Sequence, residues 1–191
     1  MNPQERAKEN DGISNSGVGQ RSAALDMPMT VRLTPVSMAD RKEIIDIFNH
    51  YIETSFAAFP DQPLPYDSFE LILNKCKGFP TVTAKNGQEI MVGFGLLHAY
   101  NPFPVFSGTA EITYFIKHEW TGKGIGTMML DYLCQKAREK GIVTILASIS
   151  SLNEPSLHFH QSRGFLECGC FRNVGRKNNI PFNIVYMQKF L

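Results

Sequence analysis

The chain has 191 residues, of which 43% are hydrophobic and 19% are charged, and its formal net charge at pH 7 is +1. This length suits a single domain, and the near-neutral charge excludes a general electrostatic attraction to nucleic acid or to an anionic membrane. No apolar run approaches the roughly 18 residues of a membrane-spanning helix, so the sequence favours a soluble protein.

The N-terminal residues and the cysteines bear on the compartment and on metal binding. Residues 1–26 are rich in Asn, Ser, Gly and charges of both signs, and they lack the apolar segment of a signal peptide. We expect a disordered leader at 1–28 and one folded domain at 29–191. Cys168 and Cys170 supply at most half a metal site, so we expect free cysteines, no metal and a cytoplasmic location.

The apolar pattern of the folded part predicts strands and helices in a definite order. Alternation of apolar and polar side chains indicates strands, and apolar side chains at every third or fourth position indicate helices. The order implies an α/β protein with a mixed sheet and helices on both faces. We predict strand 30–35, a helix begun by Ser37 or Asp40, loop 56–65, helix 66–77, strands 80–85 and 90–98 around an Asn86-Gly87 turn, strand 109–117, a helix to about 140, strand 142–150, a short helix to about 163, and strands 165–175 and 182–191.

A glycine-rich segment at 121–127 joins strand 109–117 to the next helix. The start of a helix exposes unpaired N–H groups and a partial positive charge, and glycines let an anion approach the backbone closely. The segment is therefore suited to phosphate. A P-loop needs a lysine after its last glycine, but here Thr127 follows Gly126 directly. A dinucleotide motif needs two residues between its second and third glycines, and here there is one.

Two downstream motifs accompany the glycine loop. Asn153-Glu154-Pro155-Ser156 precedes a short helix, and His160 lies four residues before Gly164. With residues 121–127, these motifs resemble the GNAT superfamily of acyl-CoA transferases, and more narrowly phosphinothricin acetyltransferase and its amino-acid N-acetyltransferase relatives. The resemblance covers nearly the whole folded part. Its other matches are residues 51–55, residues 109–111, Arg172, Gly175, Lys177 and Gln188.

This resemblance implies a fold, a co-substrate and a reaction. The fold is the GNAT fold, a mostly antiparallel mixed sheet of seven strands with helices on both faces. The co-substrate is acetyl-CoA, and its acetyl group passes to the primary amine of a small amino acid or amino-acid analogue, without a metal, in a homodimer. The residues implied to bind acetyl-CoA are Tyr114, Phe115, Ile116, Thr121, Gly122, Lys123, Gly124, Ile125, Gly126, Thr127 and Asn153.

The resemblance also implies that Glu111 and His160 are the catalytic pair. An amine must lose a proton before it attacks a thioester, and a carboxylate can remove that proton directly or through a water. Histidine, with an ordinary pKa near about 6.5, can take a proton from the amine or return one to the departing thiolate. The sequence leaves both roles open. Without catalysis, Glu111 would be a solvent-facing strand residue and His160 a packed helix residue.

The acceptor side departs from the family pattern. Ala58 and Gln62 stand where the family has Asn and Glu, and Pro181 and Asn183 stand where it has Trp and Asp. Thr121 stands where the family prefers Gln or Arg, which leaves the phosphate grip to backbone amides. We therefore expect the reaction to be retained and the acceptor to differ from phosphinothricin. A non-catalytic acyl-CoA sensor and a nucleotide-binding module are the alternatives.

Overall fold

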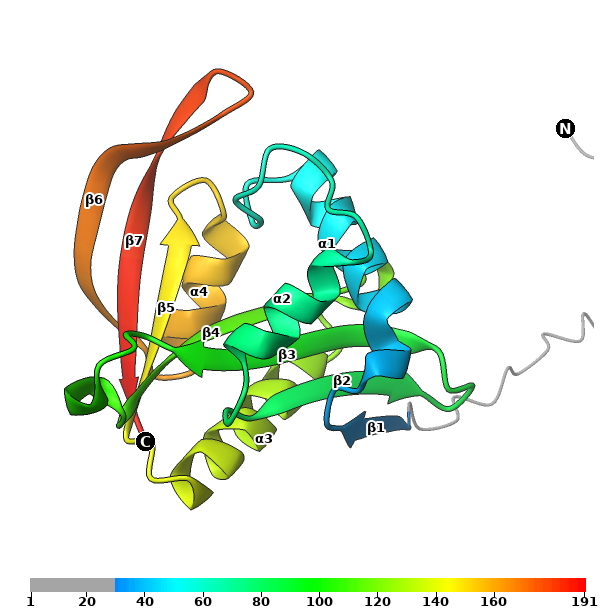
Figure 1. Cartoon of the computed structure of the whole chain (residues 1–191). Coiled ribbons are helices and arrows are strands. Elements are labelled where there is room, and N and C mark those ends of the chain that lie inside the picture. The colour runs from blue at the N-terminus through cyan, green and yellow to red at the C-terminus, as the bar shows by residue number, and fades with distance from the viewer. Residues whose placement is uncertain (1–29) are drawn as a thin grey trace, which may run out of the picture.

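Seven strands form one mixed sheet, and helices cover both of its faces (Figure 1). The structure is a computed structural model that describes residues 30–191. The predicted α/β architecture is confirmed, whereas the leader expected at 1–28 lies outside the described residues. The elements in chain order are β1 (Val31–Thr34), the 3-10 turn η1 (Met38–Asp40), α1 (Arg41–Thr54), α2 (Ser68–Lys75), β2 (Thr81–Asn86), β3 (Met91–Ala99), η2 (Pro104–Phe106), β4 (Thr109–Ile116), η3 (His118–Trp120), α3 (Ile125–Glu139), β5 (Thr144–Ser150), α4 (Glu154–Ser162), β6 (Leu166–Lys177) and β7 (Ile180–Phe190).

The sheet order is β1-β2-β3-β4-β5-β7-β6, and β4 and β5 at its centre run parallel. Every other pair of neighbouring strands in the described sheet is antiparallel. The pairing of β4 with β5 covers only Thr109–Glu111, opposite Thr144 to Leu146. Beyond Glu111 the two strands diverge, and Figure 1 shows β1 to β4 turning away from β5 to β7. The sheet is therefore split along part of its centre.

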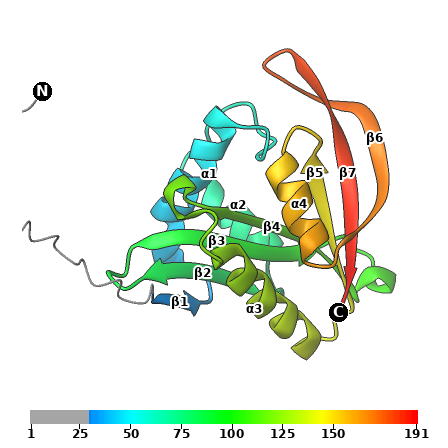
Figure 2. The ribbon, with the colours of Figure 1, turned by 180° about the vertical axis from the view of Figure 1, so that it is seen from behind.

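Two hydrophobic cores lie on opposite faces of the sheet. On one face α3 packs with Met129 and Leu133 against β2 to β5, and Figure 2 shows α3 and α4 on this side. On the other face α1 and α2 bury Ile44 and Phe69 against Phe115 of β4. Because strand side chains alternate, odd-numbered residues of β4 face α1 and α2, and even-numbered residues face α3. Glu111 and Tyr114 of β4 therefore lie on opposite faces of the sheet.

Helix α2 is shorter than the predicted helix 66–77, and hydrogen bonds at its ends explain the difference. Before it, Ser68 N–H donates to the Pro65 carbonyl in a turn of the 3-10 type. After it, Phe79 N–H donates to the Cys76 carbonyl, and Gly78 adopts a φ of +88°. Both ends are tight turns rather than continued helix.

None of the described helices has the length and apolar character to cross a bilayer.

The hairpin of β6 and β7 contacts the loop that follows α1. The ammonium of Lys177, only 4% exposed, donates to the carbonyl oxygens of Ser55 at 2.8 Å and Ala58 at 3.0 Å. Phe182 of β7 stacks on Phe59 of the same loop, with ring centroids 6.1 Å apart. Residues more than a hundred positions apart thus hold this loop beside the split in the sheet.

Candidate active site

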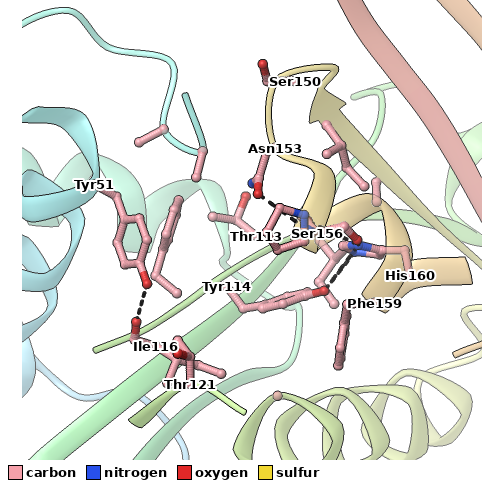
Figure 3. Close-up of a pocket in the computed structure, with 18 of the residues that line it drawn as sticks. Tyr51, Thr113, Tyr114, Ile116, Thr121, Ser150, Asn153, Ser156, Phe159 and His160 are labelled. Carbon is pink, nitrogen blue, oxygen red and sulfur yellow. Dashed lines mark hydrogen bonds between the residues drawn. The ribbon is translucent and has the colours of Figure 1, made fainter. Parts of the chain in front are cut away.

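The divergence of β4 and β5 opens a cavity of about 700 Å³ at the centre of the molecule (Figure 3). Its walls come from both strands, from the loop after α1, and from the starts of α3 and α4. No Asp, Glu, Lys or Arg stands among the described residues that line it. Any ligand in this cavity therefore meets backbone groups, hydroxyls, imidazoles, the Asn153 amide and apolar side chains.

The edge of β4 that faces this cavity offers backbone hydrogen-bonding groups. Lys117 N–H donates to the Val92 carbonyl of β3 at 2.8 Å, and backbone groups alternate in direction along a strand. The N–H and C=O groups of Ile112 and Tyr114 are therefore directed toward the split. At the end of this edge, Tyr51 donates its O–H to the Ile116 carbonyl at 2.6 Å. An extended ligand with amide groups can pair with this edge as a further strand would.

The glycine loop has the geometry of an anion cradle. Gly122 and Gly124 adopt φ values of +71° and +80°, in the left-handed region that favours glycine. Met128 is the first residue whose N–H donates back to this loop, to the Gly124 carbonyl. The preceding N–H groups lie before the first helical hydrogen bond and are left for a ligand. Negative charge is favoured at this helix start.

Gly126 and Thr121 both affect how the cradle can bind phosphate. Gly126 leaves no spare room, because an added Cβ would lie 3.3 Å from both Ile116 and the Phe159 ring. The Thr121 hydroxyl donates to the His118 carbonyl at 2.8 Å and is committed to the turn. The cradle can therefore bind an anion through backbone amides, as expected from the replacement at Thr121.

All but two of the residues predicted to bind acetyl-CoA line this cavity. One exception is Lys123, whose ammonium lies over the Trp120 ring at 4.8 Å from its centroid. The other is Ile125, which is 1% exposed and belongs to the core beneath α3. Asn153 lines the cavity and also caps α4, accepting the Ser156 N–H at 3.4 Å. The residues that line the cavity as predicted are Tyr114, Phe115, Ile116, Thr121, Gly122, Gly124, Gly126, Thr127 and Asn153.

Glu111 lies at the vertex of the split. Its Oε1 accepts the hydroxyl of Ser148 at 2.6 Å, and Ser148 is the member of this pair that lines the cavity. Burial and the negative charge of Glu111 raise the pKa of Tyr186, a neighbour on the same face of the sheet. Glu111 is half-buried, so it is more than a solvent-facing strand residue.

His160 is held in one tautomer by two hydrogen bonds. Its ring is 3% exposed, and Nδ1 lies 2.7 Å from the carbonyl oxygen of Ser156. A carbonyl only accepts, so Nδ1 carries the hydrogen and Nε2 has the lone pair. The Tyr114 hydroxyl donates to Nε2 at 2.8 Å, as Figure 3 shows. Burial lowers the pKa of His160, although the hydrogen bond to Ser156 opposes it. Burial raises the pKa of Tyr114 well above its ordinary value.

The two predicted catalytic residues lie on opposite faces of the sheet and are not bonded to each other. Glu111 is at an odd-numbered position of β4 and is therefore on the face of α1 and α2, like Phe115. His160 is on the face of α3 and α4, beside the glycine loop. The split between β4 and β5 separates them. A substrate lying in this split would have a carboxylate on one side and an imidazole on the other.

Sequence reasoning missed three partners in this arrangement. The Ser148 hydroxyl and the Tyr114 hydroxyl meet Glu111 and His160 through tertiary packing, and no local pattern predicts those contacts. The contact of His160 with Ser156 could have been predicted from the sequence, because residues four apart on a helix lie on the same face. Tyr114 was predicted to bind acetyl-CoA, with no role for its hydroxyl.

The family model described as Acetyltransferase (GNAT) family matches residues 44–165, more than half of the chain. The chain belongs to this family. The L-amino acid N-acyltransferase MnaT of Escherichia coli strain K12 is 31% identical over 155 residues, 78% of this chain and 88% of that protein. The phosphinothricin N-acetyltransferase of Streptomyces coelicolor is 26% identical over 170 residues, 85% of this chain and 99% of that protein.

A solved structure agrees with this GNAT assignment. YncA from Salmonella typhimurium, a putative acetyltransferase solved with its cofactor acetyl-CoA, superposes with a TM-score of 0.78 at 26% identity. The match covers 86% of this chain and 95% of that chain. The GNAT fold, the resemblance to phosphinothricin acetyltransferase and the prediction of an acyl-CoA-dependent N-acetyltransferase are confirmed. Neither the sensor nor the nucleotide-binding alternative is favoured.

Proposed function

We propose that this GNAT enzyme acetylates the primary amine of a small amino acid or amino-acid analogue. The observation that carries the proposal is the two-sided cavity between β4 and β5. On the side of α1 and α2 it is lined by Ser148, which is bonded to Glu111, and by an apolar loop, and both suit an acceptor. On the other side it has the glycine loop. The E. coli relative is named for an L-amino acid acceptor, which supports this class.

The residues of the cofactor side fit acetyl-CoA. The N–H groups that open α3 are suited to the pyrophosphate, because they converge before the first helical hydrogen bond. The free edge of β4 offers Ile112 and Tyr114 to the amides of the pantetheine arm. Asn153 adds a side-chain amide beside that edge. Acetyl-CoA supplies an activated thioester, and the chain contributes mainly alignment and proton transfer.

A second pocket favours an acceptor with an apolar side chain. This pocket, of about 290 Å³, lies under α1 and α2 and shares Phe48, Pro60 and Thr113 with the main cavity. Its other walls include Phe94 and Leu96, both nearly fully buried. An aliphatic, thioether or aromatic side chain can fill it, and burial of each CH₂ group adds about 0.8 kcal/mol. Lys75 also lines this pocket, so a cationic side chain would lose its hydration there and meet a like charge.

Glu111 and Ser148 are the proposed base for the amine. The Ser148 hydroxyl lines the cavity and already donates to the carboxylate at 2.6 Å. A proton leaving the amine can therefore reach Glu111 through this hydroxyl or through a water. The loss of that proton exposes the lone pair that attacks the thioester carbon.

An acceptor screen tests the proposed function. Purified protein is mixed with acetyl-CoA and a panel of amines, and release of free thiol is followed. We expect turnover with methionine, leucine and phenylalanine, much less with lysine, and none with N-acetylmethionine, whose amine is blocked. Calorimetric binding of acetyl-CoA without thiol release from any amine would contradict an enzyme and indicate a sensor.

We also propose that the enzyme is a cytoplasmic homodimer. Its described cysteines are all free, as is usual in a reducing compartment. The outer strand β6 exposes Leu166, Phe171 and Val174 at 66%, 59% and 61%. A second copy packed on this apolar strand would remove them from water. Sizing chromatography at two concentrations should give a dimer, and the variant Phe171→Asp with Val174→Asp should give a monomer.

A further inference from the structure

The hydrogen bonds of His160 restrict how a proton can reach its ring. Nδ1 donates to the Ser156 carbonyl at 2.7 Å, with the Ser156 hydroxyl also 3.3 Å away, and Nε2 accepts the Tyr114 hydroxyl at 2.8 Å. His160 is only 3% exposed, so its ring has little contact with bulk water. Proton transfer requires a hydrogen-bonded contact at the basic atom. For Nε2, that contact is the Tyr114 oxygen.

Tyr114 is placed to connect His160 with the reacting atoms. It comes from β4, its side chain lines the cavity, and its own N–H is directed along the strand edge where the acetyl-CoA arm fits. The ring is fixed by an edge contact with Phe159 at 5.8 Å between centroids and by a tilted contact with His160 at 5.5 Å. Its hydroxyl therefore stays at Nε2 without a large loss of side-chain freedom on binding.

We propose that Tyr114 is a catalytic residue that carries protons between the substrates and His160, which stores one proton during each turnover. The inference rests on the proposed N-acetyltransferase reaction. Neutral His160 accepts and later returns the same proton, and Tyr114 is the contact on both occasions. In this scheme Tyr114, rather than His160, contacts the amine and the sulfur.

The proton balance of the reaction is complete. Glu111 removes the first proton of the ammonium, and this proton is released to solvent. The amine nitrogen then forms its bond to the thioester carbon and becomes positively charged. It gives a second proton to Tyr114 Oη, while Tyr114 gives its own proton to His160 Nε2. When the carbon–sulfur bond breaks, Tyr114 protonates the thiolate and recovers a proton from His160. Amide and thiol leave, and both side chains return to their starting states.

The electrostatic environment suits this exchange. Burial keeps the pKa of Tyr114 high, so the tyrosine passes a proton on rather than remaining ionised. Burial lowers the pKa of His160, so the imidazolium gives its proton back readily. The Ser156 carbonyl accepts from Nδ1 in both states of the ring and stabilises the positive charge while it lasts.

A double-mutant comparison tests the relay. Tyr114→Phe keeps the ring and removes only the hydroxyl, and we expect kcat to fall about 10²-fold with KM for acetyl-CoA unchanged. His160→Ala should fall similarly, and the double variant should be no slower than the slower single variant, because the two residues act as one unit. Wild-type kcat in Tyr114→Phe, or losses that multiply in the double variant, would overturn the relay. Tyr132→Phe removes a tyrosine hydroxyl from α3 outside the cavity and should keep kcat.

A measurement without substrate separates the relay from the proposed function. Nitrogen-15 NMR of the wild-type protein should show His160 neutral, with hydrogen on Nδ1 and none on Nε2. In Tyr114→Phe the Nε2 resonance should shift, because its donor is lost. A hydrogen on Nε2 in the wild type would refute the relay. Absence of turnover in the wild type would instead refute the proposed acceptor reaction, and the spectrum would still decide the pairing.

Discussion

The hydroxyl of Ser148 donates a hydrogen bond of 2.6 Å to the carboxylate of Glu111, at the point where β4 and β5 part. Glu111 is opposite Leu146 in the last residue pair of the two strands. Glu111 thus belongs to the last paired position of β4 and β5, whereas Ser148 lies beyond that pair and lines the cavity. The hydrogen bond between them connects the paired part of the sheet to the cavity.

The first prediction concerns that bond. Glu111→Gln keeps the shape of the side chain but removes its basicity, so we expect kcat to fall roughly 10²–10⁴-fold. Ser148→Ala should cost less, because a water can replace the hydroxyl in contact with the carboxylate. Thiol release at saturating acetyl-CoA measures both. Equal rates in wild type and Glu111→Gln would remove Glu111 from the mechanism, provided that circular dichroism shows folded protein.

The second prediction concerns the glycine loop. Gly126→Ala places a Cβ 3.3 Å from Ile116 and Phe159, and Gly124→Ala forces alanine into the left-handed region. Each should weaken acetyl-CoA binding about tenfold, which corresponds to about 1.4 kcal/mol. Calorimetry measures the affinity. Gly87→Ala is the matched control, because its Cβ would meet nothing within 4 Å. Unchanged affinity in both loop variants would refute the backbone cradle.

The third prediction concerns Lys177. Lys177→Met keeps the length of the side chain and leaves the Ser55 and Ala58 carbonyls without their donor. We expect a loss of about 1–3 kcal/mol in the free energy of unfolding, measured with urea. KM for the acceptor should rise, because the loop after α1 lines the acceptor side, while KM for acetyl-CoA should stay constant. Lys136→Met, which removes an exposed pair on α3, should leave both quantities as in the wild type.

The fourth prediction concerns pH and the stability of the protein. The pKa of His160 is lowered in the folded state, so below about pH 6.5 the unfolded chain binds more protons than the folded one. The contribution of His160 is therefore neutral above that value and destabilising as the pH falls toward the folded pKa. Urea unfolding across this range should show a weaker pH dependence in His160→Gln than in the wild type. His158→Gln, on the exposed side of the same helix, should keep the full dependence.

Local patterns predicted the elements that local physics controls. The Asn86-Gly87 turn formed, with the Asn86 side chain accepting the N–H groups of Gln88 and Ile90. The glycine loop formed where strand β4 meets α3, because the left-handed positions at Gly122 and Gly124 are encoded in the residues themselves. The order of strands and helices followed from periodicity alone.

Contacts between distant segments could not be predicted in the same way. The bond of Lys177 to the loop after α1 joins residues 119 positions apart, and nothing in either segment indicates the other. The contact between Tyr114 and His160 depends on which helix covers which face of the sheet. Burial also decides whether a lysine or histidine is charged, and burial is a property of the complete packing. Sequence could therefore name Glu111 and His160 as candidates, but it could not predict their placement on opposite faces of the sheet.

The split between β4 and β5 has a consequence for inhibitor design. In the proposed arrangement, acetyl-CoA and the acceptor enter the cavity from opposite faces of one sheet, so the two ligands need not compete for an entrance. A single compound that joins a CoA arm to an acceptor would have to pass between β4 and β5, with Tyr114 on one side and Ser148 on the other. Such a bisubstrate compound would connect the two halves of the sheet and resist their separation.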